Sequence, residues 1–310
     1  MKVIGVTEFG GPDVLGVHEV EEPHPGPGEA RIAVRCAAVS PTDTGVRAGG
    51  RDPADATPPY VPGMDAAGVI DEVGADSPWQ VGDEVMAMAL PLREHGGAYA
   101  EKLVGASDSM ARIPANTDFA AASTLPMNGL TAVQILEFVD LEPGQTLAVT
   151  GAAGTLGGYL IQLARHAGLR VIADAAPADR SLIESLGADV IVDRGDDVSD
   201  RIREATDGSG ADAVVDAAVM NEKAVPAVRD GGTFVSVRYW KGEPTRGITF
   251  HSASVFEEYH SGAKLDRLRQ LTEDGVLTLR VAGTFPAAQA ADVHRQLEAG
   301  GVRGRLVLTF

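Results

Sequence analysis

The stretch Gly151-Ala152-Ala153-Gly154-Thr155-Leu156-Gly157 follows an apolar run, residues 146–151, and precedes a helical pattern over residues 154–167. Glycines at such a turn let the backbone approach a diphosphate and let the helix pack closely on the strand. The start of the helix then offers free N–H groups and the positive end of its dipole. The spacing is G-x-x-G-x-x-G rather than the stricter G-x-G-x-x-G, yet the strand–turn–helix context predicts a dinucleotide site here.

Strands and helices alternate around this turn, from residue 123 to residue 262. Most of the expected strands are nearly continuous Val, Ile and Ala runs, as strands covered on both faces require. The pattern predicts an α/β fold, an open doubly wound parallel sheet with crossover helices. The expected strands are residues 146–151, 170–174, 189–193, 212–217, 233–237 and 248–250, and the expected helices are residues 154–167, 179–186, 198–206 and 221–228.

The flanking segments have a different sequence pattern. Residues 1–122 contain short apolar runs, such as 31–39, 68–74 and 83–89, and a proline-rich loop over residues 49–62. Such spacing is typical of a β-rich barrel or sandwich. Residues 263–310 offer helices over 265–272 and 287–298 and a last strand over 305–310. We therefore expect a β-rich lobe, residues 1–122 and 263–310, interrupted by a dinucleotide-binding lobe, residues 123–262.

Composition excludes several classes of function. The 310 residues carry a formal charge of −18, which repels phosphate backbones and disfavours nucleic-acid binding. Cys36 is the single cysteine, so no internal disulfide framework and no zinc site built from several cysteines can form. Residues 143–164 contain no charged side chain, but their glycines predict a strand, a turn and a buried helix rather than a membrane span. We expect a soluble, cytoplasmic protein without a membrane partner.

The choice of dinucleotide depends on the end of the expected second strand. An acid that points at the adenosine ribose selects NAD, whereas a neutral residue with a nearby arginine admits the phosphate of NADP. Asp174 is an acid in about the right place, and Arg180 lies just beyond it. Because strand side chains alternate between faces, an offset of one residue decides which side chain faces the adenosine ribose. We expect NADPH, and NADH stays open.

Beyond the glycine turn, the chain resembles the medium-chain dehydrogenase/reductase superfamily and, within it, the zinc-free quinone oxidoreductase (zeta-crystallin-like) branch. The resemblance covers nearly the whole chain and implies a Rossmann lobe inserted into a GroES-like substrate lobe, with a cleft between them. The motifs that carry it occur in the order of the family, at residues 10–15, 40–43, 62–69, 81–85, 96–101, 125–132 and 304–308.

The resemblance also bears on metal chemistry. Zinc-dependent relatives have Cys, His and Cys at the positions held here by Ser40, Met64 and Met127. A serine and two methionines are not catalytic zinc ligands, which are thiolates, imidazoles or carboxylates. We therefore expect no zinc. Reduction of a conjugated acceptor needs less polarisation by a Lewis acid than reduction of a simple ketone, because delocalisation stabilises the developing anion.

The implied activity is hydride transfer from NADPH to quinones or other α,β-unsaturated carbonyls, that is, to small electrophilic molecules. Ser40, Asp43 and Tyr60 are candidates for lining the substrate site. Relatives often have Asn where Ser40 stands and Tyr where Gly45 stands, so the expected pocket is lined by smaller side chains. Asp43 can also be interpreted as a loop-capping acid and Tyr60 as an edge residue that shields the cleft.

The resemblance transfers cofactor contacts position by position. Thr131 should lie at the nicotinamide end, and Asp174 or Arg180 should meet the adenosine ribose. Ala217 and Val237, at the ends of two strands, should approach the nicotinamide. The diphosphate should lie against Gly151, Ala152, Gly154, Thr155, Leu156 and Gly157.

Two other functions stay open. One is an enoyl-thioester reductase of fatty-acid or polyketide synthesis, which would need a basic patch that the net charge disfavours. The other is a non-catalytic NADPH-binding protein, since a fold does not guarantee chemistry. Residues 247–250 form the expected last strand, and a bare sheet edge invites pairing, so we expect a homodimer.

Overall fold

The computed structural model describes residues 1–53 and 56–310, and a six-stranded parallel sheet contains the glycine turn. The strand order β10–β9–β8–β11–β12–β13 places the first strand along the chain, β8, in the middle, with successive strands added on either side. This order confirms the predicted doubly wound parallel sheet. The strands are β8 (Thr146–Thr150), β9 (Arg170–Ala175), β10 (Val190–Asp193), β11 (Ala211–Asp216), β12 (Val228–Ser236) and β13 (Thr249–Ser252).

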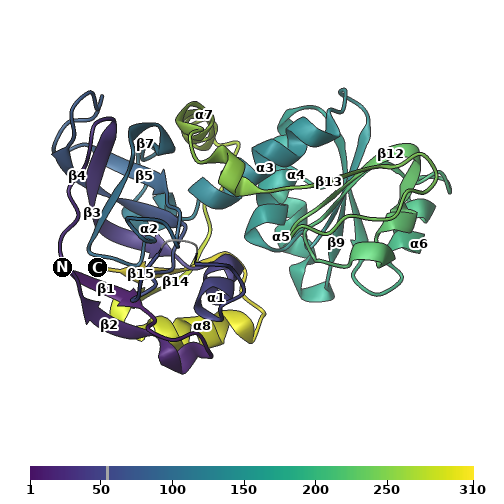
Figure 1. Cartoon of the computed structure of the whole chain (residues 1–310). Coiled ribbons are helices and arrows are strands. Elements are labelled where there is room, and N and C mark those ends of the chain that lie inside the picture. Colours follow the sequence, from purple (N-terminus) through teal and green to yellow (C-terminus); the bar gives the residue numbers. More distant parts are fainter. Residues whose placement is uncertain (54–55) are drawn as a thin grey trace. The chain divides into compact units, whose positions relative to one another are not determined.

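Helices cover both faces of this sheet. Helices α4 (Thr155–His166) and α5 (Arg180–Leu186) lie on one face, and α6 (Val198–Glu204) lies on the other (Figure 1). A longer helix, α3 (Pro126–Val139), precedes β8. The prediction of a helix over residues 221–228 is wrong, because this segment forms two short 3₁₀ turns, Asn221–Lys223 and Val225–Ala227. Pro226 has no N–H to donate within a helix, and Asn221 has a left-handed φ of 55°, so an α-helix cannot run through the segment.

The β-rich part is built on a second, mixed sheet. Its strand order is β14–β15–β3–β4–β5–β7, with β6 pairing beside β3. Strands β14 and β15 run parallel, and the other pairs described in this sheet are antiparallel. A separate antiparallel pair joins β1 and β2. The strands are β1 (Lys2–Gly5), β2 (Gly16–Glu19), β3 (Glu29–Ala38), β4 (Asp65–Val73), β5 (Glu84–Met88), β6 (Lys102–Ala106), β7 (Met110–Arg112), β14 (Val281–Pro286) and β15 (Arg305–Thr309).

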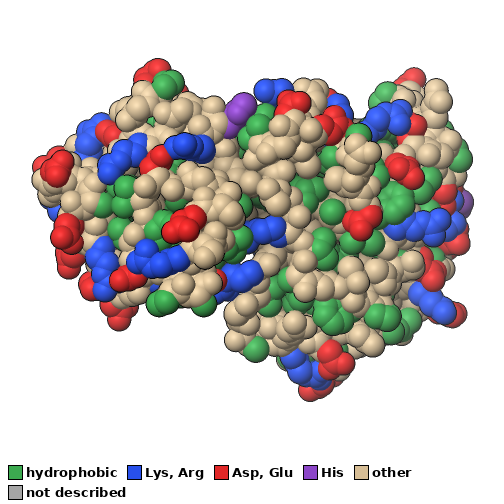
Figure 2. Space-filling model, turned by 180° about the vertical axis from the view of Figure 1, so that it is seen from behind, with side chains coloured by type: hydrophobic (Ala, Val, Ile, Leu, Met, Phe, Trp, Pro, Cys, Tyr) green, Lys and Arg blue, Asp and Glu red, His purple; other side chains and the backbone are tan. Residues whose placement is uncertain are grey.

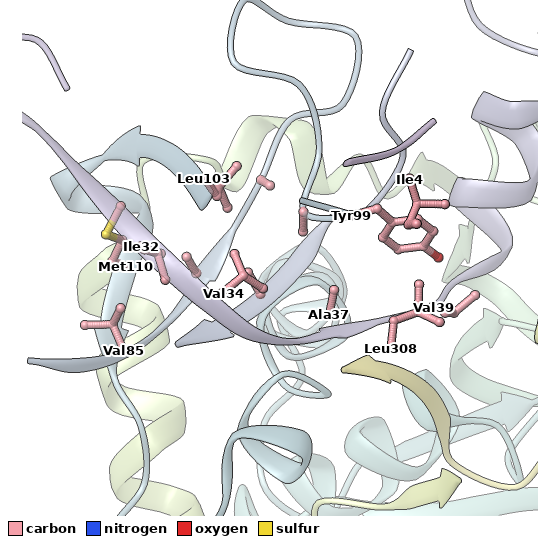
Figure 3. Close-up of a cluster of buried hydrophobic side chains, with 14 of the residues drawn as sticks. Ile4, Ile32, Val34, Ala37, Val39, Val85, Tyr99, Leu103, Met110 and Leu308 are labelled. Atoms are coloured by element: carbon pink, nitrogen blue, oxygen red, sulfur yellow. The ribbon is translucent and has the colours of Figure 1, made fainter. Parts of the chain in front are cut away.

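Short helices complete this part: α1 (Pro41–Arg47), α2 (Phe119–Ala122), α7 (Gly262–Glu273) and α8 (Ala290–Glu298). The loop predicted over residues 49–62 includes residues 54 and 55, which lie outside the described residues. Alternate residues of β3, β4 and β5 point into a shared core, which also includes Tyr99 between Ile4 and Val39 (Figure 3). The side chains of Ile32, Ile70 and Tyr99 are wholly buried there.

The described residues form two compact units. One contains Met1–Met127, Tyr259–Gly275 and Leu279–Phe310, and the other contains Asn128–Glu258 and Val276–Thr278. The expected division into residues 1–122 with 263–310 and residues 123–262 stays a prediction. None of the helices in the described residues combines the length and the apolar character needed to cross a membrane.

The close approach of β3 explains why position 68 of the motif at residues 62–69 is glycine. A Cβ at this position of β4 would lie 2.2 Å from the carbonyl oxygen of Ala33 in β3. We predict that Gly68→Ala lowers the free energy of unfolding by about 2 kcal/mol or more, because two paired strands must separate. Gly11→Ala is the matched control, since its Cβ would meet no atom within 4 Å and its φ is −70°. Urea denaturation of both variants measures the difference, and equal stabilities would contradict the explanation.

Candidate functional site

The glycine turn joins β8 to α4 with little room for side chains. Gly151 has a left-handed φ of 68°, and a Cβ there would lie 2.9 Å from the backbone of Ala217. A Cβ on Gly157 would lie 2.5 Å from the carbonyl oxygen of Gly151, so the first turn of the helix packs directly on the loop. Gly154 is the N-cap of α4, whose first N–H groups lack partners within the helix. The turn is therefore a backbone cradle suited to a diphosphate.

The residues predicted at the cradle are either buried or half-buried. Ala152 and Thr155 are buried, whereas Gly151, Gly154 and Leu156 are half-buried. Thr131, on α3, is 9% exposed. The assignment of these residues to the diphosphate stays a prediction, and Thr131 lies on the helix that precedes β8.

Asp174 faces the turn from β9. Its carboxylate accepts a hydrogen bond from the N–H of Ala152 at 2.9 Å, and its side chain is 2% exposed. Burial raises the pKa of Asp174 above its ordinary value, while the N–H of Ala152 and the positive charge of Arg194 oppose that rise. Within the described residues, its second oxygen, Oδ2, is buried without a hydrogen-bond donor. Asp174 thus braces the glycine turn instead of presenting a free carboxylate at the surface.

Arg194 is the residue near Asp174 that sequence reasoning missed. Its Nε lies 3.5 Å from Asp174 Oδ2, and its side chain is 47% exposed. Arg194 follows β10, which pairs in parallel with β9 so that Val192 lies opposite Asp174. The signal was present in the sequence, because carboxyl ends of adjacent parallel strands meet at one edge of the sheet. Arg180, the predicted alternative, instead forms an ion pair of 2.5 Å with Asp193.

The carboxyl ends of β11 and β12 carry strained backbone. Val219 follows β11 with φ 59°, and Arg238 and Tyr239 follow β12 with φ 63° and 64°. A left-handed φ is a marked outlier for a β-branched residue such as valine, and such strain concentrates at functional sites. Ala217 and Val237, the predicted nicotinamide contacts, are half-buried beside these residues in the chain.

The same edge contains a buried acid. Asp216, the last residue of β11, accepts hydrogen bonds of 2.7 Å from the hydroxyl of Thr150 and from the N–H of Asn221. These bonds link the end of β8 to the segment that follows β11. The backbone at the edge is therefore held in place by side-chain hydrogen bonds on both strands.

Ser40 and Asp43 lie together in the β-rich unit, and both are wholly buried. Asp43 Oδ2 accepts from the N–H of Ser40 at 2.7 Å and from its hydroxyl at 3.0 Å. The N–H of Gly63 donates to Asp43 Oδ1 at 3.1 Å, and the hydroxyl of Tyr99 donates to Oδ2 at 3.2 Å. Burial raises the pKa of Asp43 to about 6, against the opposing effects of the Ser40 N–H and the charge of Arg305.

Tyr60 makes a different set of contacts. Its ring stacks on Phe9 with centroids 4.8 Å apart, and it lines a cavity of about 990 Å³ together with Leu92, Arg93 and His95. The structure therefore places Ser40 and Asp43 together, whereas Tyr60 lies among other residues. The contacts of Asp43 are those of an acid that braces its loop, which is the alternative interpretation given above. Within the described residues, no three His, Cys, Asp or Glu side chains gather as metal ligands do.

Comparisons with known proteins agree with this architecture. Residues 26–115 match the alcohol dehydrogenase GroES-like domain, and residues 186–308 match the zinc-binding dehydrogenase family. The chain is 32% identical to an NADPH-dependent alkenal/one oxidoreductase, chloroplastic, of Arabidopsis thaliana over 99% of this chain and 79% of that protein. It is 29% identical to a quinone oxidoreductase of Pseudomonas aeruginosa over 99% of each.

Two solved structures are similar over their full lengths. One is described as an NAD-dependent alcohol dehydrogenase, with a TM-score of 0.90 and 29% identity over 100% of both chains. The other is a mycobacterial protein complexed with NADPH, with a TM-score of 0.88 and 29% identity over 100% of both chains. The chain belongs to the medium-chain dehydrogenase/reductase superfamily and, within it, to the quinone oxidoreductase branch.

Proposed function

We propose that this quinone oxidoreductase-like chain is an NADPH-dependent, zinc-independent reductase of quinones and other α,β-unsaturated carbonyls. The observation that carries the proposal is the backbone cradle at Gly151–Gly157 after β8, together with Arg194, which follows β10 and faces Asp174 on the intervening β9. The relatives support the chemistry, since one is named an NADPH-dependent alkenal/one oxidoreductase and another a quinone oxidoreductase.

The residues present fit the cofactor. Gly151, Gly154 and Gly157 let the turn pack tightly on its own backbone, so that a diphosphate would lie against backbone N–H groups at the start of α4. Ala152, Thr155 and Leu156 complete that loop. Thr131, Ala217 and Val237 would hold the nicotinamide end. NADPH supplies a hydride when bound, and the chain's part is to orient the two reactants and exclude water.

Arg194 is the best-placed residue for the adenosine phosphate. Half of its side chain is exposed, and it is drawn toward Asp174 across 3.5 Å without a close hydrogen bond. A phosphate beside the guanidinium would gain a bidentate partner, which is the geometry that arginine favours. Arg180 is already paired with Asp193, so it is the weaker candidate.

We predict that Arg194→Gln weakens NADPH binding at least tenfold, which corresponds to about 1.4 kcal/mol, and changes NADH binding little. Arg180→Gln is the matched control, because it removes a neighbouring guanidinium that is already paired with Asp193. Titration of the purified variants, followed by nicotinamide fluorescence, measures both affinities. Equal losses for both cofactors, or a larger effect of Arg180→Gln, would overturn the assignment to Arg194.

On the substrate side we propose that Ser40 and Tyr60 line the site and that Asp43 positions Ser40. Ser40, Met64 and Met127 provide no zinc-binding group, so a reducible substrate must stabilise its own developing charge. Quinones and enones do so by conjugation. A hydroxyl that donates to the carbonyl oxygen of such a substrate strengthens its interaction as negative charge develops there.

The direct test is turnover by the purified protein with NADPH. We expect oxidation of NADPH by a simple benzoquinone and by a short enal, and none by the corresponding saturated ketone or aldehyde. Preference for an enoyl-thioester would favour the alternative reductase. Against that alternative, acidic side chains occur beside the basic ones on the face drawn in Figure 2. Binding of NADPH without turnover of any acceptor would favour the non-catalytic alternative.

We also propose a homodimer formed through β13. This strand ends the order of the parallel sheet, so its outer edge has no strand partner among the described residues. Sheet edges of this kind pair readily with an identical edge. Light scattering should give twice the chain mass of 32.2 kDa. A mass of one chain, unchanged on concentration, would contradict the proposal.

A further inference from the structure

A chain of buried polar side chains joins α1 to α8 within the β-rich unit. Asp43, Tyr99 and His294 are wholly buried, and Arg47 is 4% exposed. These groups form one connected line of hydrogen bonds that ends on the half-exposed Glu298, which accepts from Arg47 at 2.7 Å. Buried polar groups are costly unless satisfied, so a fully connected line of this kind is a specific feature.

Arg47 sets the direction of every hydrogen bond in the line. An arginine only donates, and its Nη1 lies 3.3 Å from His294 Nδ1, so Nδ1 must accept. Burial, reinforced by the charge of Arg47, lowers the pKa of His294 to about 4, so the ring is neutral and carries its proton on Nε2. That N–H then donates to the hydroxyl oxygen of Tyr99 at 3.1 Å, which leaves the Tyr99 proton for Asp43.

Four donors therefore converge on Asp43: the hydroxyl of Tyr99, the N–H of Gly63 and both the N–H and the hydroxyl of Ser40. Two further charges act on it, Arg305 on β15 and Asp65 on β4, and their effects oppose each other. While Asp43 is charged it can only accept, so the Ser40 proton points inward and Ser40 Oγ offers lone pairs to any other group. Once Asp43 is protonated, it can donate to Ser40 Oγ, and the Ser40 proton is free to turn away.

We propose that Tyr99 and His294 are positioning residues that, through Asp43, determine whether the Ser40 hydroxyl accepts or donates a hydrogen bond at the substrate site. The inference rests on the proposed function, because it assumes that Ser40 faces the carbonyl oxygen of the substrate. A donating Ser40 stabilises negative charge on that oxygen, whereas an accepting Ser40 does not. The protonated form of Asp43 is therefore the more active one.

The pH dependence follows with a definite sign. The pKa of Asp43 is raised to about 6, so the carboxyl loses its proton as the pH rises through that value. The rate of reduction should fall over the same range. Tyr99→Phe removes a donor that favours the charged carboxylate, so it should move the pKa of Asp43, and the inflection of the rate profile, upward.

The experiment compares variants that differ in single donors. Tyr99→Phe keeps the ring that packs between Ile4 and Val39 and deletes only the hydroxyl (Figure 3). His294→Gln keeps an acceptor for Arg47 and a donor for Tyr99, whereas His294→Leu removes both. Tyr159→Phe, at a buried tyrosine on α4, controls for the loss of a buried hydroxyl in general. Circular dichroism checks that each variant folds.

Two readouts are needed: carboxyl carbon NMR of labelled aspartate, assigned with Asp43→Asn, and kcat as a function of pH. We expect an inflection near pH 6 in both for the wild-type protein. We expect a rise of at least about half a pH unit for Tyr99→Phe and for His294→Leu, and none for His294→Gln or Tyr159→Phe.

Three results would overturn the inference: an unmoved Asp43 titration in Tyr99→Phe, a moved titration with an unmoved rate profile, or equal behaviour of His294→Gln and His294→Leu. Failure of the proposed function is distinguishable from these. If the proposed function is wrong, no acceptor is turned over, although the NMR titrations still respond to the variants. In that case Ser40 has no substrate to contact.

Discussion

The β-rich unit depends on one buried ion pair, Arg305 with Asp65. Arg305 Nη2 lies 2.7 Å from Asp65 Oδ2, and the same guanidinium donates to the carbonyl oxygens of Val39 and Ala38 at the end of β3. Asp65 Oδ1 in turn accepts from the N–H of Met127 at 2.6 Å. One pair thus ties together β15, β3, β4 and the first turn of α3, which are far apart in sequence. Buried charges persist only where such partners surround them, so the loop that contains Ser40 and Asp43 starts from a fixed strand end.

Much of the fold could be predicted because its parallel strands are continuous apolar runs and its turn is rich in glycine. The predicted centres of β8, β9, β10 and β11 are those observed, with ends that differ by a residue. The helix predicted over 221–228 failed because apolar spacing was weighed without the restriction that Pro226 imposes. The starts of β4 and β12 were placed too late. Strand β4 begins with Asp65, Ala66 and Ala67, which carry no periodic signal, whereas β12 begins with Val228, the last residue of the wrongly predicted helix, followed by polar and glycine residues.

The candidate site was predictable only where chemistry is local in the sequence. The glycine cradle is a single stretch of chain, and its geometry could be anticipated. The orientation of Asp174 could not, because an offset of one residue decides whether a strand side chain faces the turn or the solvent. In the line from Asp43 through Tyr99 to His294, the hydrogen-bonded partners are 56 and 195 positions apart in the sequence, and no spacing rule connects them. Tyr99 belongs to a motif that the sequence singled out, but its hydroxyl contacts are visible only in three dimensions.

The inward orientation of Asp174 has a consequence for how this protein can change. The acid that stabilises the glycine turn, Asp174 on β9, and the cation that we propose for the adenosine end of the cofactor, Arg194 after β10, are different residues. Structural support and ligand selection are therefore separate properties of the chain. The preference for one cofactor can change, or be redesigned, by replacing the half-exposed Arg194. Such a replacement leaves the hydrogen bond from the N–H of Ala152 to Asp174 intact. Under the proposed assignment, a substitution at Arg194 would act on cofactor preference without touching the buried carboxylate that holds the turn.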